Sequence, residues 1–177
     1  MLRIAISTHI YSTNITNTGI ILLDKTDKEI LILLQKRADI SISEIAEAVN
    51  LSSSPCWRRI QRLEEDGYIQ QRVTLLDRNK LNLGTTVFVA VRTNQHTPEW
   101  LEAFAHAVDD IPEVVEFYRM SGDVDYLLRV VVPDIATFDT VYKKLISTVE
   151  LSDVSSSFAM EDIKYTTELP LTYAAMK

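Results

Sequence analysis

The stretch from Leu51 to Ile69 constrains the fold of this chain more than any other part of the sequence. Ser52 is a typical N-cap residue, and Gly67 lies where a left-handed C-cap is favoured. Three apolar residues between them recur at the spacing i, i+4 and i+7: Cys56, Ile60 and Leu63. The stretch therefore predicts an amphipathic helix that packs one face against a core.

The opposite face of this helix is polar and carries no carboxylate before Glu64. At about 100° per residue, it presents six side chains: Ser53, Ser54, Trp57, Arg58, Gln61 and Arg62. Hydroxyl, indole, amide and guanidinium groups can contact phosphates and base edges in the major groove of double-stranded DNA. The alternative is a solvated helix face. The helices predicted upstream favour the interpretation that this face contacts DNA.

Two patterns upstream predict further helices. Ser41 and Glu44 match a capping box before a short helix, and Thr26 and Glu29 match another before an earlier helix. Asn50 tolerates left-handed backbone, so the chain can turn tightly between the second helix and the third. Two short helices joined in this way form a helix-turn-helix, whose second helix enters the groove.

The arginines of the third helix have different expected roles. Arg58 and Arg62 suit either phosphate or guanine, and the sequence does not divide the two. Arg59 lies near the apolar stripe, so we expect it to form an internal ion pair with a neighbouring carboxylate.

Charge is unevenly distributed along the 177 residues, whose net charge is −7. Residues 24–76 carry 8 basic and 9 acidic groups, whereas residues 77–177 carry 9 and 16. The acidic excess therefore belongs to the second half, which need not touch DNA. This division favours a sequence-specific reader over a nucleoid-type architectural protein with little sequence preference, which is the alternative function.

Catalytic and metal chemistry have no support in the sequence. Cys56 is the only cysteine, lies on the apolar stripe and has no neighbouring base, so we expect a core residue rather than a nucleophile or redox sensor. The histidines are scattered, and glycine occurs only four times. We therefore expect that the protein is not an enzyme and binds no metal and no cofactor. A lone cysteine also favours a reducing, cytoplasmic location.

The chain divides into five predicted parts. Residues 1–22 lack persistent periodicity and any long apolar run, so we expect a poorly ordered extension rather than a signal peptide or a membrane span. Residues 23–76 form a winged helix-turn-helix, in which 68–76 is a strand. Residues 77–84 are a polar hinge, 85–168 a second domain, and 169–177 a tail.

The second domain alternates strands and helices in the order βαββαβ, which predicts a ferredoxin-like fold and an α+β protein overall. In its first strand, Val87, Val89 and Val91 occupy one face, and Phe88 and Ala90 occupy the other. A sheet face that is open to solvent should be polar, and this one is not. We therefore expect a second subunit to cover it. A two-fold homodimer would also present two recognition helices to successive major grooves, about 34 Å apart.

The sequence resembles the Lrp/AsnC (feast/famine) transcriptional regulators. Four segments carry the resemblance, in the family's order and spacing: Leu23–Leu31, Ser54–Gly67, Ser121–Leu128 and Val154–Thr167. The resemblance implies an N-terminal helix-turn-helix, a C-terminal effector-binding and oligomerisation domain, and dimers that often assemble into octamers or other rings. It also implies a small amino acid as the effector, which alters assembly or DNA affinity.

Carried over by position, the effector site has two parts. The loop contributes Gly122, Asp123, Asp125 and Tyr126, and the facing strand contributes Ser155, Ser156, Ser157 and Phe158. A carboxylate would accept the ligand's ammonium, with Asp125 the first choice and Asp123 shaping the turn. Gly and Asp are also ordinary hairpin formers, which is the alternative interpretation. The polar serine run argues against leucine, and the chain's ending is similar to a cysteine-responsive branch.

Overall fold

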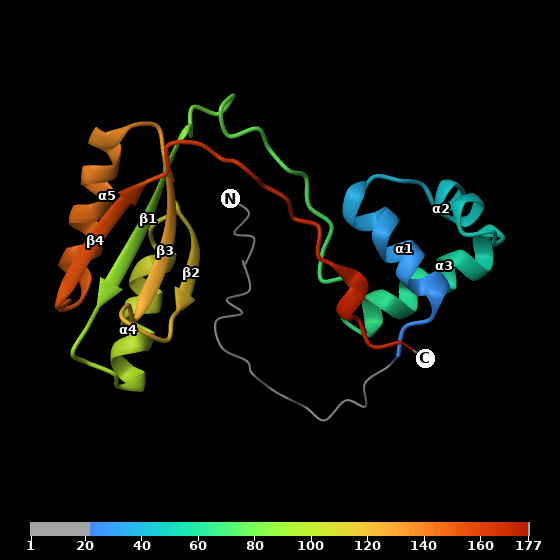
Figure 1. Ribbon diagram of the computed structural model, residues 1–177, viewed down its shortest axis with the longest axis horizontal. Helices are drawn as coiled ribbons and strands as arrows, with labels where there is room; N and C mark the ends of the chain where they lie inside the picture. Colours follow the sequence, from blue (N-terminus) through green and yellow to red (C-terminus); the bar gives the residue numbers. More distant parts are fainter. Residues whose placement is uncertain (1–21, 177) are drawn as a thin grey trace, which may run out of the picture. The chain divides into compact units, whose positions relative to one another are not determined.

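The computed structural model describes residues 22–176, which divide into two units. The helical unit contains residues 22–75 and 164–176, and the sheet unit contains residues 76–163. Both units can be followed in Figure 1. Within the described part of the chain, every helix is too short or too polar to cross a bilayer. The predicted extension 1–22 lies outside these residues, apart from residue 22.

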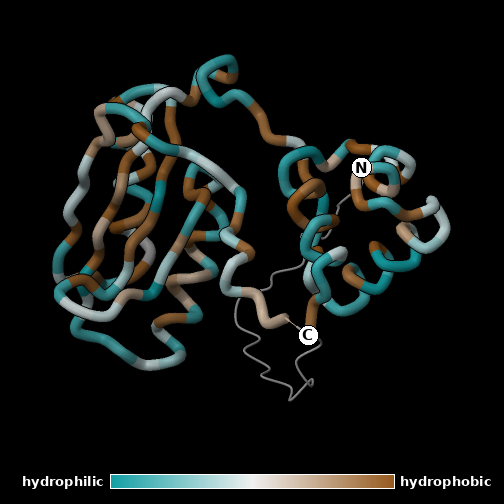
Figure 2. Tube along the Cα trace, turned by 45° about the vertical axis from the view of Figure 1, so that its right-hand side comes forward, coloured by the Kyte–Doolittle hydropathy of each residue, from teal (hydrophilic) through white to brown (hydrophobic). Residues whose placement is uncertain are grey.

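Three helices form the helical unit: α1 (Lys25–Lys36), α2 (Ile42–Ala48) and α3 (Ser53–Glu65). Each turns an apolar stripe inward, and Figure 2 shows brown and teal residues mixed along the same helices. The shared core is almost free of solvent exposure and includes the three residues of the predicted stripe of α3: Cys56, Ile60 and Leu63. This packing confirms the predicted orientation of α3.

The start of α1 differs from the prediction. Asp24 is the N-cap and Asp27 the third helical residue, and each side chain accepts a hydrogen bond from the backbone N–H of the other. The Thr26–Glu29 capping box is therefore wrong, because an overlapping pair with the same spacing lies two residues earlier. The consequence is that two carboxylates gather at the N-terminus of α1, where the helix dipole favours negative charge.

The helix-turn-helix has the predicted local geometry. Ser41 and Glu44 form the reciprocal capping box of α2. Asn50 has φ 54°, and the next N–H, that of Leu51, donates to the carbonyl of Ala46 at 2.8 Å. Gly67 ends α3 with φ 76°, in the left-handed region that a residue with a Cβ adopts at a cost.

The segment 68–76 is not a strand in this chain. None of its residues pairs in a ladder with any described residue, although its composition is β-branched and apolar. A strand needs a partner for its N–H and C=O groups, and the described residues provide none here. Val73, Leu75 and Leu76 are exposed as a result.

The sheet unit confirms the βαββαβ order. Its elements are β1 (Thr85–Arg92), α4 (Pro98–Asp109), β2 (Val114–Arg119), β3 (Tyr126–Val132), α5 (Ile135–Thr148) and β4 (Asp153–Phe158). The strands are antiparallel in the order β2-β3-β1-β4, and α4 and α5 cover one face (Figure 1). Val87, Val89 and Val91 are fully buried on that face, with Phe104 of α4.

The open face carries two rows of side chains, which follow from the strand register. One row runs Tyr118, Leu127, Ala90 and Ser155, and the other runs Glu116, Arg129, Phe88 and Ser157. Arg129 ion-pairs with Glu116 at 2.5 Å, and its hydrogen bond holds the pKa of that carboxyl below its ordinary value. The Tyr118 hydroxyl also donates to Glu116, at 3.0 Å, and the other side chains of both rows are apolar or small and neutral.

Residues 164–176, which we name the C-terminal strap, pack on the helical unit. The amide of Leu169 donates to Gln35 Oε1 at 3.0 Å, and Gln35 Nε2 donates to the Leu169 carbonyl at 3.3 Å. Leu171, in a short 3-10 turn (Leu171–Tyr173), packs against the helical core. At the end of the strap, Met176 forms a parallel bridge with Leu23. The domain boundaries predicted above remain predictions.

Candidate nucleic-acid interface and effector site

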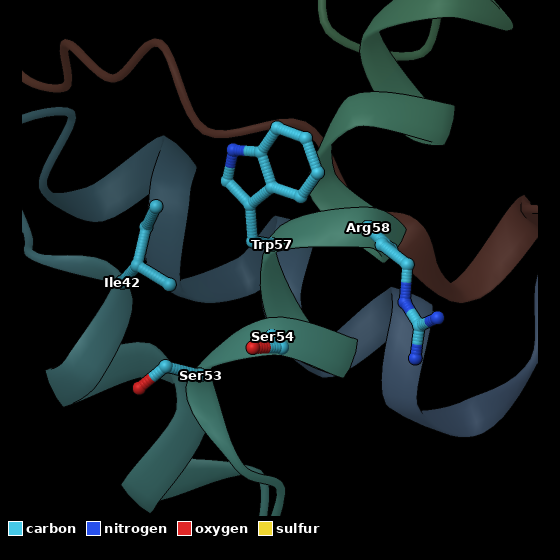
Figure 3. A pocket seen from close by; sticks show the side chains of 5 residues that line it. All are labelled: Ile42, Ser53, Ser54, Trp57 and Arg58. Carbon is cyan, nitrogen blue, oxygen red and sulfur yellow. The ribbon is translucent and has the colours of Figure 1, made fainter.

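The N-terminal half of α3 forms one concave, solvent-facing surface. Ser53, Ser54, Trp57 and Arg58 line an open hollow of about 520 Å³, together with Ile42 of α2. Figure 3 shows the Trp57 indole standing beside Ile42 and the Arg58 guanidinium extending from the other side of the helix. Trp57 is 49% exposed despite its large apolar ring. The structure thus brings together four of the six residues predicted to contact DNA.

Arg58 is an exposed cation without a counter-ion among the described residues. Within residues 22–176, no acceptor forms a hydrogen bond or an ion pair with its guanidinium. Guanidinium groups carry five donors in a rigid fork that fits phosphate or the O6 and N7 atoms of guanine. Arg58 can therefore engage an external anion or base edge without breaking a contact inside this part of the chain.

Arg59 forms the internal ion pair that the sequence predicted. Its Nη1 lies 2.5 Å from Asp24 Oδ2 and 2.7 Å from Asp27 Oδ1, which joins α3 to the start of α1. The hydrogen bond to Asp24 leads the contacts that raise the pKa of Arg59. Burial alone would raise the pKa of the Asp24 carboxyl, but the Asp27 N–H and the Arg59 guanidinium outweigh it and lower the pKa.

Gln61 and Arg62 have partners inside the protein. Arg62 Nη2 lies 2.6 Å from Asp27 Oδ2, and Gln61 Nε2 donates to Glu64 Oε2 at 2.9 Å. Arg62 nevertheless reaches the surface, with 36% of its side chain exposed, and it lines a second hollow of about 340 Å³ with Arg58. These two predicted contacts are thus held in place, whereas Arg58 extends into solvent.

The predicted effector loop lies at the end of the sheet where β1 ends. Gly122 has φ 124°, a conformation open to glycine because it lacks a Cβ. Arg92 Nε donates to the Asp123 carbonyl at 2.6 Å, and the Thr93 N–H donates to Asp125 Oδ2 at 2.9 Å. The Asp125 carboxylate therefore fixes the loop, while that of Asp123 is exposed. Asp125 therefore takes part in shaping the turn, and which of the two carboxylates meets a ligand stays a prediction.

The facing strand divides its predicted residues between two sides of the sheet. Ser155 and Ser157 lie on the open face, in the rows of Ala90 and Phe88. Ser156 pairs with the buried Val89, and the ring of Phe158 lies 5.3 Å from that of Phe138 of α5, on the helix-covered face. Arg92 ties the two parts of the site together, because it also ion-pairs with Asp153 at the start of β4.

Tyr126 lies in the core rather than on the open face. It is 3% exposed, and its ring lies 5.6 Å from those of Trp100, Phe104 and Phe117. In this chain Tyr126 is a core residue that directly follows the loop. No group of His, Cys, Asp or Glu side chains in residues 22–176 is arranged to hold a metal ion.

Two residues at these sites were missed in the sequence. Asp27 lies under the recognition helix with no exposed surface, and Arg92 joins the effector loop to β4. The available signal for Asp27 was its spacing of three from Asp24, which matches a capping box. Arg92 gave no local signal, because its partners are 31 and 61 residues away.

Both halves of the chain match known families. Residues 23–70 match a family described as winged helix-turn-helix DNA-binding, and residues 86–169 match the Lrp/AsnC ligand binding domain. The DNA-binding transcriptional activator DecR of Escherichia coli strain K12 is 50% identical over 151 residues, which span 85% of this chain and 99% of that protein.

Two solved structures have the same fold over both units. One is an AsnC family transcriptional regulator from Agrobacterium tumefaciens, with 59% identity and a TM-score of 0.83, covering 85% of this chain and 99% of that chain. The other is a transcriptional regulator of Neisseria meningitidis in complex with L-Met, with 38% identity, a TM-score of 0.81 and coverage of 85% and 97%. The chain belongs to the Lrp/AsnC family and is a DNA-binding transcriptional regulator with a ligand-binding domain, not an enzyme.

Proposed function

We propose that the concave surface at the start of α3 reads DNA through Ser53, Ser54, Trp57 and Arg58. The observation that carries the proposal is the solvent-facing guanidinium of Arg58 beside two exposed hydroxyls at a helix N-terminus. Backbone N–H groups and the positive end of the helix dipole add to the attraction for phosphate there. Arg58 is the member of this set with the reach and the donors to read guanine.

Arg62 and Gln61 have a different part in the proposed interface. The ion pair with Asp27 occupies one Nη of Arg62 and leaves the other to donate to a phosphate. A cation held in this way fixes the register of the protein on the duplex but carries no sequence information. Gln61 contacts the DNA beside Arg62 once its side-chain amide no longer donates to Glu64.

The experiment compares binding to a promoter fragment selected with the wild-type protein and to random DNA of the same length. Arg58→Ala should lower affinity for the selected fragment more than for random DNA. Arg37→Ala is the matched control, because it removes an arginine that pairs with Asp39 and Glu44, away from the concave surface. Equal binding of wild-type protein to both DNAs would favour the nucleoid-type alternative.

For the sheet unit, we propose that a small free amino acid binds at the loop 122–125 and along β4. The exposed carboxylate of Asp123 accepts the ammonium, and the hydroxyls of Ser155 and Ser157 donate to the carboxylate. Ala90 leaves room between Leu127 and Ser155 for a short side chain. Tyr126, Ser156 and Phe158 form the support behind the site. The Neisseria meningitidis relative, which was solved with L-Met, supports an amino-acid ligand.

A small polar effector fits the serines of β4, and we retain membership of a cysteine-responsive branch as a proposal. Thermal melting against each common amino acid tests it, because a ligand at about a hundred times its dissociation constant stabilises the fold by about 2.7 kcal/mol. Asp123→Asn should abolish the shift caused by the active ligand. Asp139→Asn, on the outer face of α5, should leave it unchanged.

The working form proposed is a homodimer, with rings of dimers such as octamers, acting on DNA in the cytoplasm. The apolar rows around Phe88 and Leu127 support a second copy covering the open sheet face. Effector binding would then change how dimers associate and thereby their affinity for DNA. The coupling free energy between the two sites is typically about 1–3 kcal/mol, and DNA binding must change the affinity for the effector by the same factor. Light scattering of Phe88→Arg, in which a charge enters that face, should show a smaller assembly than wild type.

A further inference from the structure

The sheet unit connects to the helical unit by two chain segments. The first link follows α3 and leads into β1, and the second follows β4 and leads into the C-terminal strap (Figure 1). A single linker would leave the helical unit free to rotate about it. A second covalent link adds a constraint, and its effect depends on the residues at which each link is held.

Each link is fixed at both of its ends. On the helical unit, Arg72 pairs with Glu64 of α3 at 2.8 Å, and Leu169 exchanges two hydrogen bonds with Gln35 of α1. Within the sheet unit, the side chain of Arg78 contacts both the Thr86 hydroxyl and the Asp162 carboxylate, and thereby joins the first link to the second.

The free spans between these fixed points are short. Arg78 lies six positions after Arg72, a reach of at most about 22 Å when fully extended. Leu169 lies seven positions after Asp162, a reach of at most about 25 Å, and Pro170 restricts the backbone directly afterwards. The two spans differ in length by one position only.

The second link begins at the proposed effector site. Ser155, Ser157 and Phe158 lie on β4, and pairing continues one residue further, where the Ala159 N–H donates to the Thr86 carbonyl at 2.9 Å. Leu169 follows Ala159 by ten positions in the chain. Leu169 is bound to α1, whose Asp24 and Asp27 in turn hold Arg59 and Arg62 of α3.

We propose that the C-terminal strap is a positioning element for the recognition helix. It restricts rotation of α3 about the first link, and it transmits movements of β4 to α1 and α3. The proposal rests on the proposed function, because orientation matters only where two recognition helices of a dimer must fit one operator. Orientation then contributes to binding two half-sites but not to binding one.

The test separates positioning from simple support of the helical fold. Leu171→Ser removes the side chain that packs the strap on the helical core, and Tyr173→Ser is the matched control, because its side chain lies 88% exposed two residues away. Binding is measured to a fragment selected with the wild-type protein, and to the same fragment with one half-site scrambled. A second variant ends the chain after residue 168.

For both Leu171→Ser and the shortened chain, we expect the preference for two half-sites over one to fall by about fivefold or more, at the lower bound of typical coupling. Affinity for the single half-site should stay as in wild type. An equal loss on both fragments would mean that the strap only supports the fold, and this would overturn the proposal. So would a preference that is unchanged, or that Tyr173→Ser lowers as much.

The proposed DNA-binding function and the proposed positioning role of the strap can be disproved separately. A wild-type protein that shows no preference for two half-sites overturns the proposed dimeric reader itself. A wild-type preference that survives loss of the strap overturns only the positioning role. Amide hydrogen exchange adds an independent check, since the Leu23 N–H, which donates to the Ala175 carbonyl, should lose protection in the shortened chain.

Discussion

Asp27 has no exposed surface, and its Oδ2 atom lies 2.6 Å from Nη2 of Arg62, on the helix proposed to face DNA. Its other oxygen lies 2.7 Å from Arg59, so one carboxylate of α1 holds two arginines of α3. Two of the three arginines of the recognition helix therefore serve its position, and one of these retains surface for a ligand. The third, Arg58, extends into solvent.

Removing the buried carboxylate should destabilise the helical unit. Asp27→Ala leaves Arg59 and Arg62 without their shared partner, and we expect a loss of about 3 kcal/mol in the free energy of unfolding, the lower end for a broken buried pair. The lower end applies because both arginines keep contact with water. Urea unfolding followed by circular dichroism measures the loss.

Glu29→Gln provides the matched control for Asp27→Ala, since Glu29 forms an exposed pair with Lys25 on the same helix. It should change stability by well under about 1 kcal/mol, as is usual for surface pairs. If the two variants unfolded at the same urea concentration, the buried cluster would have no special role.

The Asp24 carboxyl should make the helical unit sensitive to acid. Its pKa lies below the ordinary value of 3.8, so its contribution to stability is fully present above that value. The contribution is lost as the pH falls through the lowered pKa. The reason is that the folded state binds the proton more weakly than the unfolded chain, so protonation favours unfolding. Asp24→Asn should flatten the decline of the urea midpoint below about pH 4. A decline as steep as in wild type would assign acid sensitivity to other groups.

Salt dependence should distinguish the two surface arginines of α3. If Arg62 contacts a phosphate, Arg62→Ala should reduce the slope of log K against log salt by about 0.9 for each phosphate that it no longer neutralises, on every DNA sequence. If Arg58 reads guanine, Arg58→Ala should reduce discrimination against a changed base by about 5- to 150-fold. Fluorescence anisotropy titrations at several salt concentrations measure both quantities. An identical pattern for both variants would contradict this division of roles.

Cys56 should be unreactive in the folded protein. Burial raises the pKa of its thiol, only partly offset by the nearby Arg59 charge, and the side chain has no exposed surface. An aromatic disulfide reagent should therefore modify it at least about a thousandfold more slowly than in the guanidinium-unfolded chain, because modification must await opening of the helical core. Rapid modification of native protein would show that this core opens readily.

The parts of the fold that depend on neighbouring residues could be predicted from the sequence. Asn50, Gly67 and the stripe of Cys56, Ile60 and Leu63 act within one or two turns of helix, and the structure confirms all of them. The capping box at Thr26 was wrong because a second pair with the same spacing overlaps it. Pattern alone does not rank two such pairs.

Features that depend on distant residues were less accessible. The segment 68–76 has the composition of a strand but lacks a partner among the described residues, and the C-terminal strap packs on residues more than a hundred positions earlier. The division of Ser155 and Ser157 from Ser156 and Phe158 was predictable in principle, because successive strand residues point to opposite faces. Which side the helices cover is a property of the whole sheet.

Trp57 and Trp100 are the only two tryptophans, and they lie in different units and in opposite environments. The indole of Trp57 is half in water on the surface proposed for DNA, whereas Trp100 is packed among Phe104 and Tyr126. The protein thus has a built-in optical reporter in each unit. Quenching by iodide should reach Trp57 and spare Trp100, and shielding of the quenched fraction would follow operator occupancy without any label.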